Sequence, residues 1–95
     1  MARTPIHPGE ILSDELSELN IAAAELARAI KVPPNRITQI VAGKRSVSAN
    51  TALRLGKWFG TGPLLWLNLQ QAYELDLASQ KLKETLGKIK TRKAA

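Results

Sequence analysis

The sequence predicts an all-α protein of five helices, the last of them extended. Apolar residues recur in successive segments at the i, i+3, i+4 spacing of one helix face, and no segment has the pattern of a strand. Two of these apolar sets lie on either side of Val32 and the pair Pro33-Pro34, where proline stops a helix from continuing. The 95 residues suffice for one small domain, with no internal repeat.

The first helix is expected to span Pro8 to Leu19. Pro8 fits an opening turn, and Glu10 suits the positive end of the helix dipole. Leu12, Leu16 and Leu19 form its apolar stripe. The opposite face has two interpretations, a solvated surface or a docking site for a basic partner. Its acidic residues are Asp14, Glu15 and Glu18.

The second and third helices are expected at about residues 22 to 30 and 34 to 42, joined by a tight turn. Their apolar faces consist of Leu26, Ala27, Ile30, Ile37, Ile40 and Val41. Val32 is an apolar plug in the turn, Pro34 suits the first turn of the next helix, and Gly43 is placed to end that helix in a left-handed cap. Two short helices joined in this way are typical of a DNA-reading unit.

The outward face of the third helix is polar, because its apolar side is committed to the core. Four of its residues are short and polar enough to meet base edges: Asn35, Arg36, Thr38 and Gln39. Arg36 is suited to a bidentate contact with guanine. Asn35 and Gln39 are suited to adenine, and Thr38 to a thymine methyl group. The alternatives for these residues are phosphate contact, helix capping or a solvated surface.

Three further residues are expected to contact phosphates where the chain crosses the sugar-phosphate backbone, namely Pro34, Lys44 and Arg45. They would add affinity without specificity. Residues 26 to 73 hold seven bases and no acid, within a chain of formal net charge +6. Such a region suits a polyanion, and a solvated basic surface is the alternative.

The fourth helix is expected to begin after the N-cap Ser48 and to end at Gly60. The fifth opens with Gly62-Pro63 and continues to at least Leu77. Apolar residues occupy nearly its full circumference, which is more than one core can cover, so a second copy of the chain is expected to cover the remainder. The candidates for this dimer interface are Trp66, Leu69, Tyr73 and Leu77.

The C-terminal residues 84 to 95 have the composition of a basic tail. Gly87 and the lysines around it favour fraying over a packed helix. We therefore expect a disordered tail there and one folded domain over residues 1 to 83.

The composition argues against an enzyme. The chain has no cysteine and one histidine, and it has no Gly-rich phosphate loop. We expect no catalytic residue, no cofactor and no metal site, and we expect His7 before Pro8 to be a cap or a surface group. The start lacks the apolar stretch of a signal peptide, and no segment approaches the roughly 18 apolar residues of a membrane helix. A cytoplasmic location is therefore expected, without a membrane partner.

The helix pair resembles the helix-turn-helix of the Cro/repressor-like (XRE) family. The resemblance is carried by residues that stand in register with that motif: Leu26-Ala27, Val32, Ile37, Ile40, Gly43 and Lys44-Arg45. It implies a lambda-repressor-like fold and a dimer that binds double-stranded DNA. Its third helix would lie in the major groove at two half-sites about one helical turn apart.

Outside that unit, the chain is similar to the HigA-type (VapI-like) antitoxins of bacterial toxin–antitoxin systems. The similarity covers about residues 5 to 78, and its most specific part is Trp66-Leu67-Asn68-Leu69-Gln70. Other matching segments are His7-Pro8-Gly9-Glu10-Ile11-Leu12 and residues 51 to 55. The similarity implies a homodimeric repressor that binds a palindromic operator in its own promoter and neutralises a small RNA-cleaving, RelE-like toxin. The acidic face of the first helix is then the candidate toxin-docking site.

The chain departs from the family's pattern at the start of the second helix. Ala22 and Ala23 stand where such proteins usually have a Ser or Thr cap and a Gln that contacts phosphate. Loss of a cap costs about 1 kcal/mol, and loss of the Gln removes one contact to the DNA backbone. Two alternatives stay open: a stand-alone XRE-type regulator without a toxin, or a toxin-masking module with little DNA binding.

Overall fold

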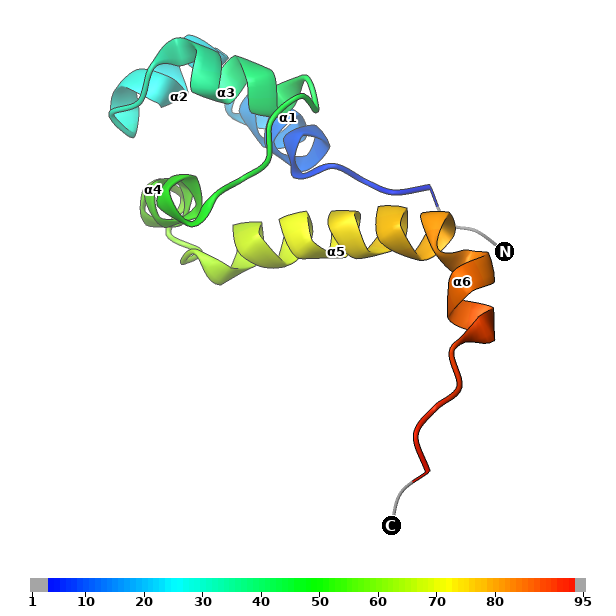
Figure 1. Cartoon of the computed structure of the whole chain (residues 1–95). Helices are drawn as coiled ribbons and strands as arrows, with labels where there is room; N and C mark the ends of the chain where they lie inside the picture. Colours follow the sequence, from blue (N-terminus) through cyan, green and yellow to red (C-terminus); the bar gives the residue numbers. More distant parts are fainter. Residues whose placement is uncertain (1–3, 94–95) are drawn as a thin grey trace.

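The computed structural model describes residues 4 to 93 of the chain, and six helices lie within them (Figure 1). In chain order they are α1 (Pro8–Leu19), α2 (Ala23–Ala29), α3 (Pro34–Val41), α4 (Ala49–Phe59), α5 (Leu64–Lys81) and α6 (Lys83–Lys88). This part of the chain has no strand, so the all-α prediction is confirmed. Within the same residues, no helix is long and apolar enough to cross a membrane.

The long helix α5 runs beneath α1, α2, α3 and α4, and α6 turns away below its C-terminal end (Figure 1). α1, α2 and α3 lie together above it, and α4 lies near its N-terminal end (Figure 1). α2 packs mainly on α3, while α5 packs on α4 and α1. The core fills the space between them, and its largest apolar side chains are Trp66, Leu12, Leu26, Ile37, Ile40 and Leu55.

Trp66 belongs to this core. Its side chain is 1% exposed, and its ring centroid lies 5.4 Å from that of Phe59 in α4. The prediction that Trp66 contacts a second copy is therefore wrong, because its surface is already covered within the chain. Helical spacing places apolar residues around α5 but does not tell which of them face the chain's own core.

α1 has the bounds that the sequence predicted, and a reciprocal cap fixes its N-terminus. The backbone N–H of Gly9 donates to Nδ1 of His7 at 2.8 Å, and the backbone N–H of His7 donates to Oε2 of Glu10 at 3.1 Å. His7 is thus a cap, as expected. Gly9 allows this end of α1 to touch α3, since a Cβ atom there would collide with the carbonyl oxygen of Ile40.

The ends of α3 and α4 follow the predicted signals. The backbone N–H of Thr51 donates to Oγ of Ser48 at 3.3 Å, so Ser48 caps α4 as expected. Gly43 and Gly60 both have a φ of 76°, the left-handed conformation that ends a helix. α2 begins one residue later than predicted and ends one residue earlier, and α3 ends at Val41 rather than at residue 42.

The C-terminal part is more helical than expected. α5 continues to Lys81, and after Leu82 the chain forms the additional helix α6, where the backbone N–H of Leu86 donates to the carbonyl oxygen of Leu82 at 2.8 Å. The expectation of disorder from residue 84 is therefore wrong for residues 84 to 88, because Leu82 and Leu86 keep helical spacing despite Gly87. Residues 89 to 93 have no regular structure, and residues 94 and 95 lie outside the described part.

Candidate nucleic-acid interface

α2 and α3 meet in a tight turn centred on Lys31 and Val32. The backbone N–H of Val32 donates to the carbonyl oxygen of Ala27 at 3.0 Å, and the Val32 side chain is buried as an apolar plug. Lys31 has a φ of 65°, a left-handed conformation that glycine adopts at lower cost. The turn was predicted, but its left-handed residue was not, because lysine is uncommon in that conformation.

The four predicted base-contacting residues lie on the side of α3 away from the core. Asn35, Thr38 and Gln39 are exposed and Arg36 is half-buried, in contrast to the fully buried Ile37 and Ile40 of the same helix: this is the predicted division into an outer and an inner face. The hydroxyl of Thr38 donates to the carbonyl oxygen of Asn35 at 3.3 Å. Because this hydroxyl is engaged, the methyl group of Thr38 is left for an apolar contact.

The predicted phosphate-contacting residues border this face. Pro34 is exposed in the first turn of α3, and Lys44 and Arg45 are exposed in the loop after it. Nη1 of Arg45 donates to Oε1 of Gln39 at 3.1 Å, so the loop and the helix are linked. A bidentate pair with adenine uses both the oxygen and the nitrogen of the Gln39 amide. Because an amide oxygen has two lone pairs, Gln39 can form that pair while it still accepts the hydrogen bond from Arg45.

Arg36 points toward the first turn of α4. Its Nη1 atom donates to Oδ1 of Asn50 at 3.4 Å. The same oxygen accepts a hydrogen bond from Nε of Arg54 at 2.9 Å. Arg54 in turn donates from Nη1 to the carbonyl oxygens of Ile30 at 2.7 Å and Lys31 at 3.2 Å. Two guanidinium groups thus meet at one neutral amide.

The loop between α3 and α4 is tied to α5 by Gln70. This residue is 5% exposed, and its Oε1 atom accepts a hydrogen bond from the backbone N–H of Val47 at 2.8 Å. Nε2 of Gln70 donates to Oε2 of Glu74 at 3.0 Å, which fixes the orientation of the amide. The loop that carries Lys44 and Arg45 is therefore anchored at its C-terminal end.

Asn50, Arg54 and Gln70 were not singled out from the sequence. Their contacts join residues 14 to 24 positions apart along the chain, a separation at which helical periodicity carries no signal. Gln70 does belong to the block Trp66-Leu67-Asn68-Leu69-Gln70, which was recognised through a resemblance and not through its physics.

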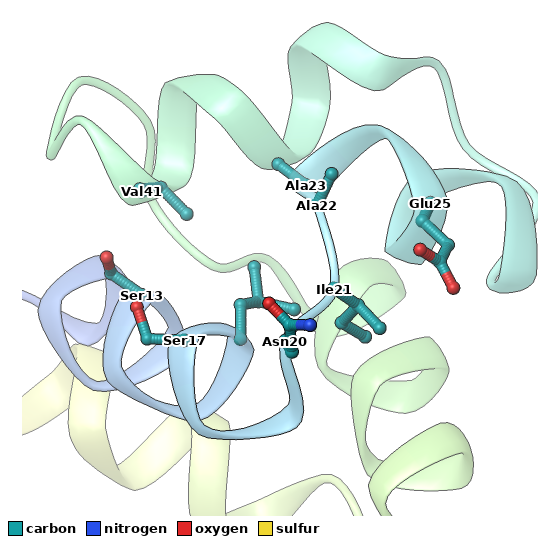
Figure 2. Close-up of a pocket in the computed structure, with 9 residues that line it drawn as sticks. Ser13, Ser17, Asn20, Ile21, Ala22, Ala23, Glu25 and Val41 are labelled. Atoms are coloured by element: carbon teal, nitrogen blue, oxygen red, sulfur yellow. The ribbon is translucent and has the colours of Figure 1, made fainter.

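The N-terminus of α2 borders an open cleft of about 690 Å³ (Figure 2). Its N-cap, Ala22, makes no side-chain hydrogen bond within the described residues, which agrees with the departure noted in the sequence. Ser13 and Ser17 of α1 and Asn20, the C-cap that follows it, line the opposite wall, and Val41 of α3 lines another side (Figure 2). The polar side chains near the start of α2 therefore belong to Ser13, Ser17 and Asn20, and not to the N-cap residue of α2 itself.

Two further surfaces were predicted to bind partner proteins. Asp14, Glu15 and Glu18 are exposed on α1, on the side opposite to the buried Leu12 and Leu16. They form one acidic face, which we call the α1 acidic face.

The other surface is the apolar outside of α5 and α6. Leu77 is 44% exposed, Leu69 is partly buried against the core, and the ring of Tyr73 packs edge-on against His7 with centroids 4.9 Å apart. The large exposed apolar residues between the start of α5 and the end of α6 lie on more than one side of the helix axis and are Leu64, Leu65, Leu75, Leu77, Leu82 and Leu86. So many large exposed apolar residues are unusual for a surface that stays in contact with water, and they are typical of a surface that another molecule covers.

A polar outer face on the second helix of a tight helix pair, followed by a basic loop, defines a protein of the helix-turn-helix class. The helix-turn-helix family model HTH_3 matches residues 15–67. Virulence-associated protein I of Dichelobacter nodosus is 49% identical over 76 residues, which cover 79% of this chain and 70% of that protein. The chain therefore belongs to the XRE-type helix-turn-helix family, a family of DNA-binding regulators and antitoxins rather than of enzymes.

Solved structures of HigA-family antitoxins share the fold. An addiction module antidote protein of the HigA family from Coxiella burnetii matches with a TM-score of 0.91 and 48% identity, over 96% of this chain and 100% of that chain. Antitoxin HigA of Pseudomonas aeruginosa, solved with the higBA promoter, matches with a TM-score of 0.88 and 41% identity over the same shares. The resemblance to HigA-type antitoxins is thus confirmed.

Proposed function

We propose that the chain is a sequence-specific transcriptional repressor that acts as a homodimer on a palindromic operator in its own promoter. α3 lies in the major groove, where Asn35, Arg36, Thr38 and Gln39 contact bases while Pro34, Lys44 and Arg45 contact phosphates. The observation that carries the proposal is the common exposure of these residues on α3 and its following loop, within a segment that has seven bases and no acid. The promoter solved with the HigA of Pseudomonas aeruginosa supports it.

The dimer is proposed to form through the apolar outside of α5. Leu65 and Leu77 are 45% and 44% exposed there, and Leu69 and Tyr73 lie at its edge. A second copy that covers this surface removes apolar area from water at about 25 cal/mol per Å². Residues 1 to 83 remain our proposal for the DNA-binding and dimerising domain.

We further propose that the chain is the antitoxin of a toxin–antitoxin pair. Its partner is a small, basic, RNA-cleaving protein of the RelE-like kind. The α1 acidic face is the docking site, because its carboxylates complement a basic protein that has evolved to bind RNA. This face lies on a different element from the base-contacting residues of α3, so both partners have a surface of their own.

The DNA proposal is tested by anisotropy titration of a labelled duplex from the chain's own promoter region, with a scrambled duplex as the control. Replacing Arg36 by Ala should cost about 1 to 3 kcal/mol on the operator and relax one base position. Replacing Lys44 by Ala should weaken binding to both duplexes alike and lower the salt slope by about 1. A wild-type chain that binds neither duplex at low salt rules out the repressor.

The toxin proposal is tested by co-expressing the chain with the product of the neighbouring gene. A triple variant, Asp14→Asn with Glu15→Gln and Glu18→Gln, should lose the toxin and still bind the promoter duplex. If this variant still binds the toxin, the docking site lies on another surface of the chain. A neighbouring gene that encodes no small basic protein would favour a stand-alone regulator.

A further inference from the structure

Arg36 reaches its base only if its guanidinium is held in one direction. An arginine side chain has four rotatable torsions, and a side chain that is ordered before binding loses less entropy on binding. Nε of Arg36 is buried and has no hydrogen-bond partner within the described residues. The hydrogen bond from Nη1 of Arg36 to Oδ1 of Asn50 therefore sets the direction of the guanidinium.

Asn50 is itself fixed by Arg54. Both neighbours of the Asn50 amide are arginines, which have donors and no acceptor, so its oxygen has to face them. Arg54 is anchored at its other side by the carbonyl oxygens of Ile30 and Lys31, at the end of α2. The end of α2, the first turn of α4 and the start of α3 are thus connected through one chain of hydrogen bonds.

The charge of this group matters as well as its geometry. An amide oxygen accepts from both guanidinium groups without neutralising them, whereas a carboxylate would hold them and cancel part of their charge. The two positive charges stay available to a polyanion in a segment that contains no acid between residues 26 and 73.

We infer that Asn50, held by Arg54, is a positioning residue that sets the base preference of Arg36. The inference rests on the proposed function, since it concerns how the α3 side chains read DNA. Asn50 acts through Arg36, so its loss removes discrimination at one base position and leaves the sequence-independent part of binding in place.

The test measures dissociation constants for a set of promoter duplexes that differ only in the base at the position that Arg36→Ala relaxes. Wild type should prefer one base there by about 5- to 150-fold. Asn50→Ala should lose most of that preference while its affinity for scrambled DNA stays within about twofold. Asn50→Asp keeps an oxygen for both arginines, so it should keep the preference and weaken binding to every duplex.

Two controls make the result specific. Leu53→Ala removes an exposed side chain of similar size from α4, the helix that carries Asn50, and should change neither quantity. The double variant Arg36→Ala with Asn50→Ala should show no further loss of preference beyond Arg36→Ala alone, because the two residues act as one unit. Circular dichroism melting curves verify that each variant is folded.

Each outcome decides the point. A preference that survives in Asn50→Ala, or a loss that adds to that of Arg36→Ala, overturns the positioning role and leaves the repressor proposal standing. A wild-type chain that binds no DNA at low salt overturns both. An Asn50→Asp variant that loses the preference shows that charge at this site, and not the hydrogen bond to Arg36, controls the base contact.

Discussion

α1 and α2 are neighbouring helices whose ends are held in opposite ways. α1 begins with the reciprocal cap of His7 and Glu10 and ends at Asn20, a residue type that tolerates its left-handed φ of 57°. α2 begins at the uncapped Ala22 and is followed by Lys31 with a φ of 65°. The local sequence therefore stabilises α1, whereas α2 depends on contacts from outside its own seven residues.

Those outside contacts lie on the buried side of α2 and at the residues that follow its C-terminus. Leu26 and Ala27 are fully buried against the core, and Arg54 of α4 donates hydrogen bonds to the carbonyl oxygens of Ile30 and Lys31. A helix of this length is marginal alone, because few of its backbone groups are paired within it. The comparison teaches that the first helix of the DNA-reading pair is formed by the fold and not by its own ends.

The largest expected effect comes from Gly9, at the strong end of α1. In Gly9→Ala the new Cβ atom meets the backbone of Ile40, which cannot give way as a flexible side chain can. We expect a loss of about 3 kcal/mol in the free energy of unfolding, measured by urea titration followed by circular dichroism.

The matched control for this variant is Gly87→Ala. A Cβ atom at Gly87 meets nothing within 4 Å in the described structure, and alanine favours the helix α6 more than glycine does, so Gly87→Ala should cause no loss and a gain of at most about 1 kcal/mol in the free energy of unfolding. Equal effects of the two substitutions would mean that α1 does not touch α3 at Gly9.

Removal of the α1 cap should have the next largest effect. His7→Ala deletes the Nδ1 acceptor for the backbone N–H of Gly9 and the ring that packs on Tyr73. We expect a loss of about 1 to 2 kcal/mol in urea titration. Glu10→Gln keeps an oxygen for the backbone N–H of His7 and should lose less; a His7→Ala variant as stable as wild type would show that the cap adds nothing.

The comparison can be reversed by giving α2 the cap that it lacks. Ala22 already has the extended backbone of an N-cap, with φ of −82° and ψ of 154°. Ala22→Ser should therefore raise the unfolding free energy by about 1 kcal/mol without a backbone change. Ala24→Ser places the same hydroxyl inside the helix and should give no gain, so a gain in both variants would count against capping as the cause.

The smallest expected effect lies at the other end of α2. Lys31→Gly relieves the left-handed strain but adds freedom to the unfolded chain, so the net gain should be about 0.5 kcal/mol. Lys31→Ala keeps the strain and should not stabilise. Thermal melting curves of the two variants distinguish these outcomes. A lower melting temperature in Lys31→Gly would show that a contact of the lysine side chain stabilises the fold by more than the left-handed backbone conformation costs.

Local signals in the sequence were enough to place most helix ends. Pro8, Ser48 and Gly60 mark their boundaries by fixed dihedrals, a side-chain acceptor and a left-handed backbone, respectively, and each of these acts within a few residues. The division of α3 into a buried and an outer face also followed from periodicity. The contacts of the base-contacting and phosphate-contacting residues with DNA stay predictions.

Most features that could not be predicted from the sequence depend on contacts between residues that are far apart along the chain. Trp66 was assigned to the dimer interface because an apolar helix does not reveal which neighbour covers each side. Asn50 and Arg54 are polar residues on an exposed part of α4, and only the fold brings them to Arg36. α6 was missed because Gly87 and the surrounding lysines lower helix propensity without abolishing it.

Gln70 has a consequence for how such regulators diversify. It sits on the helix that we propose as the dimer contact, and it holds the backbone of Val47, next to the loop that would touch phosphates. In the proposed dimer, a substitution that shifts α5 would therefore also shift that loop in each subunit. Changes in α3 would then alter which bases are preferred, while α5 would set the distance between half-sites, so sequence preference and operator spacing would evolve separately.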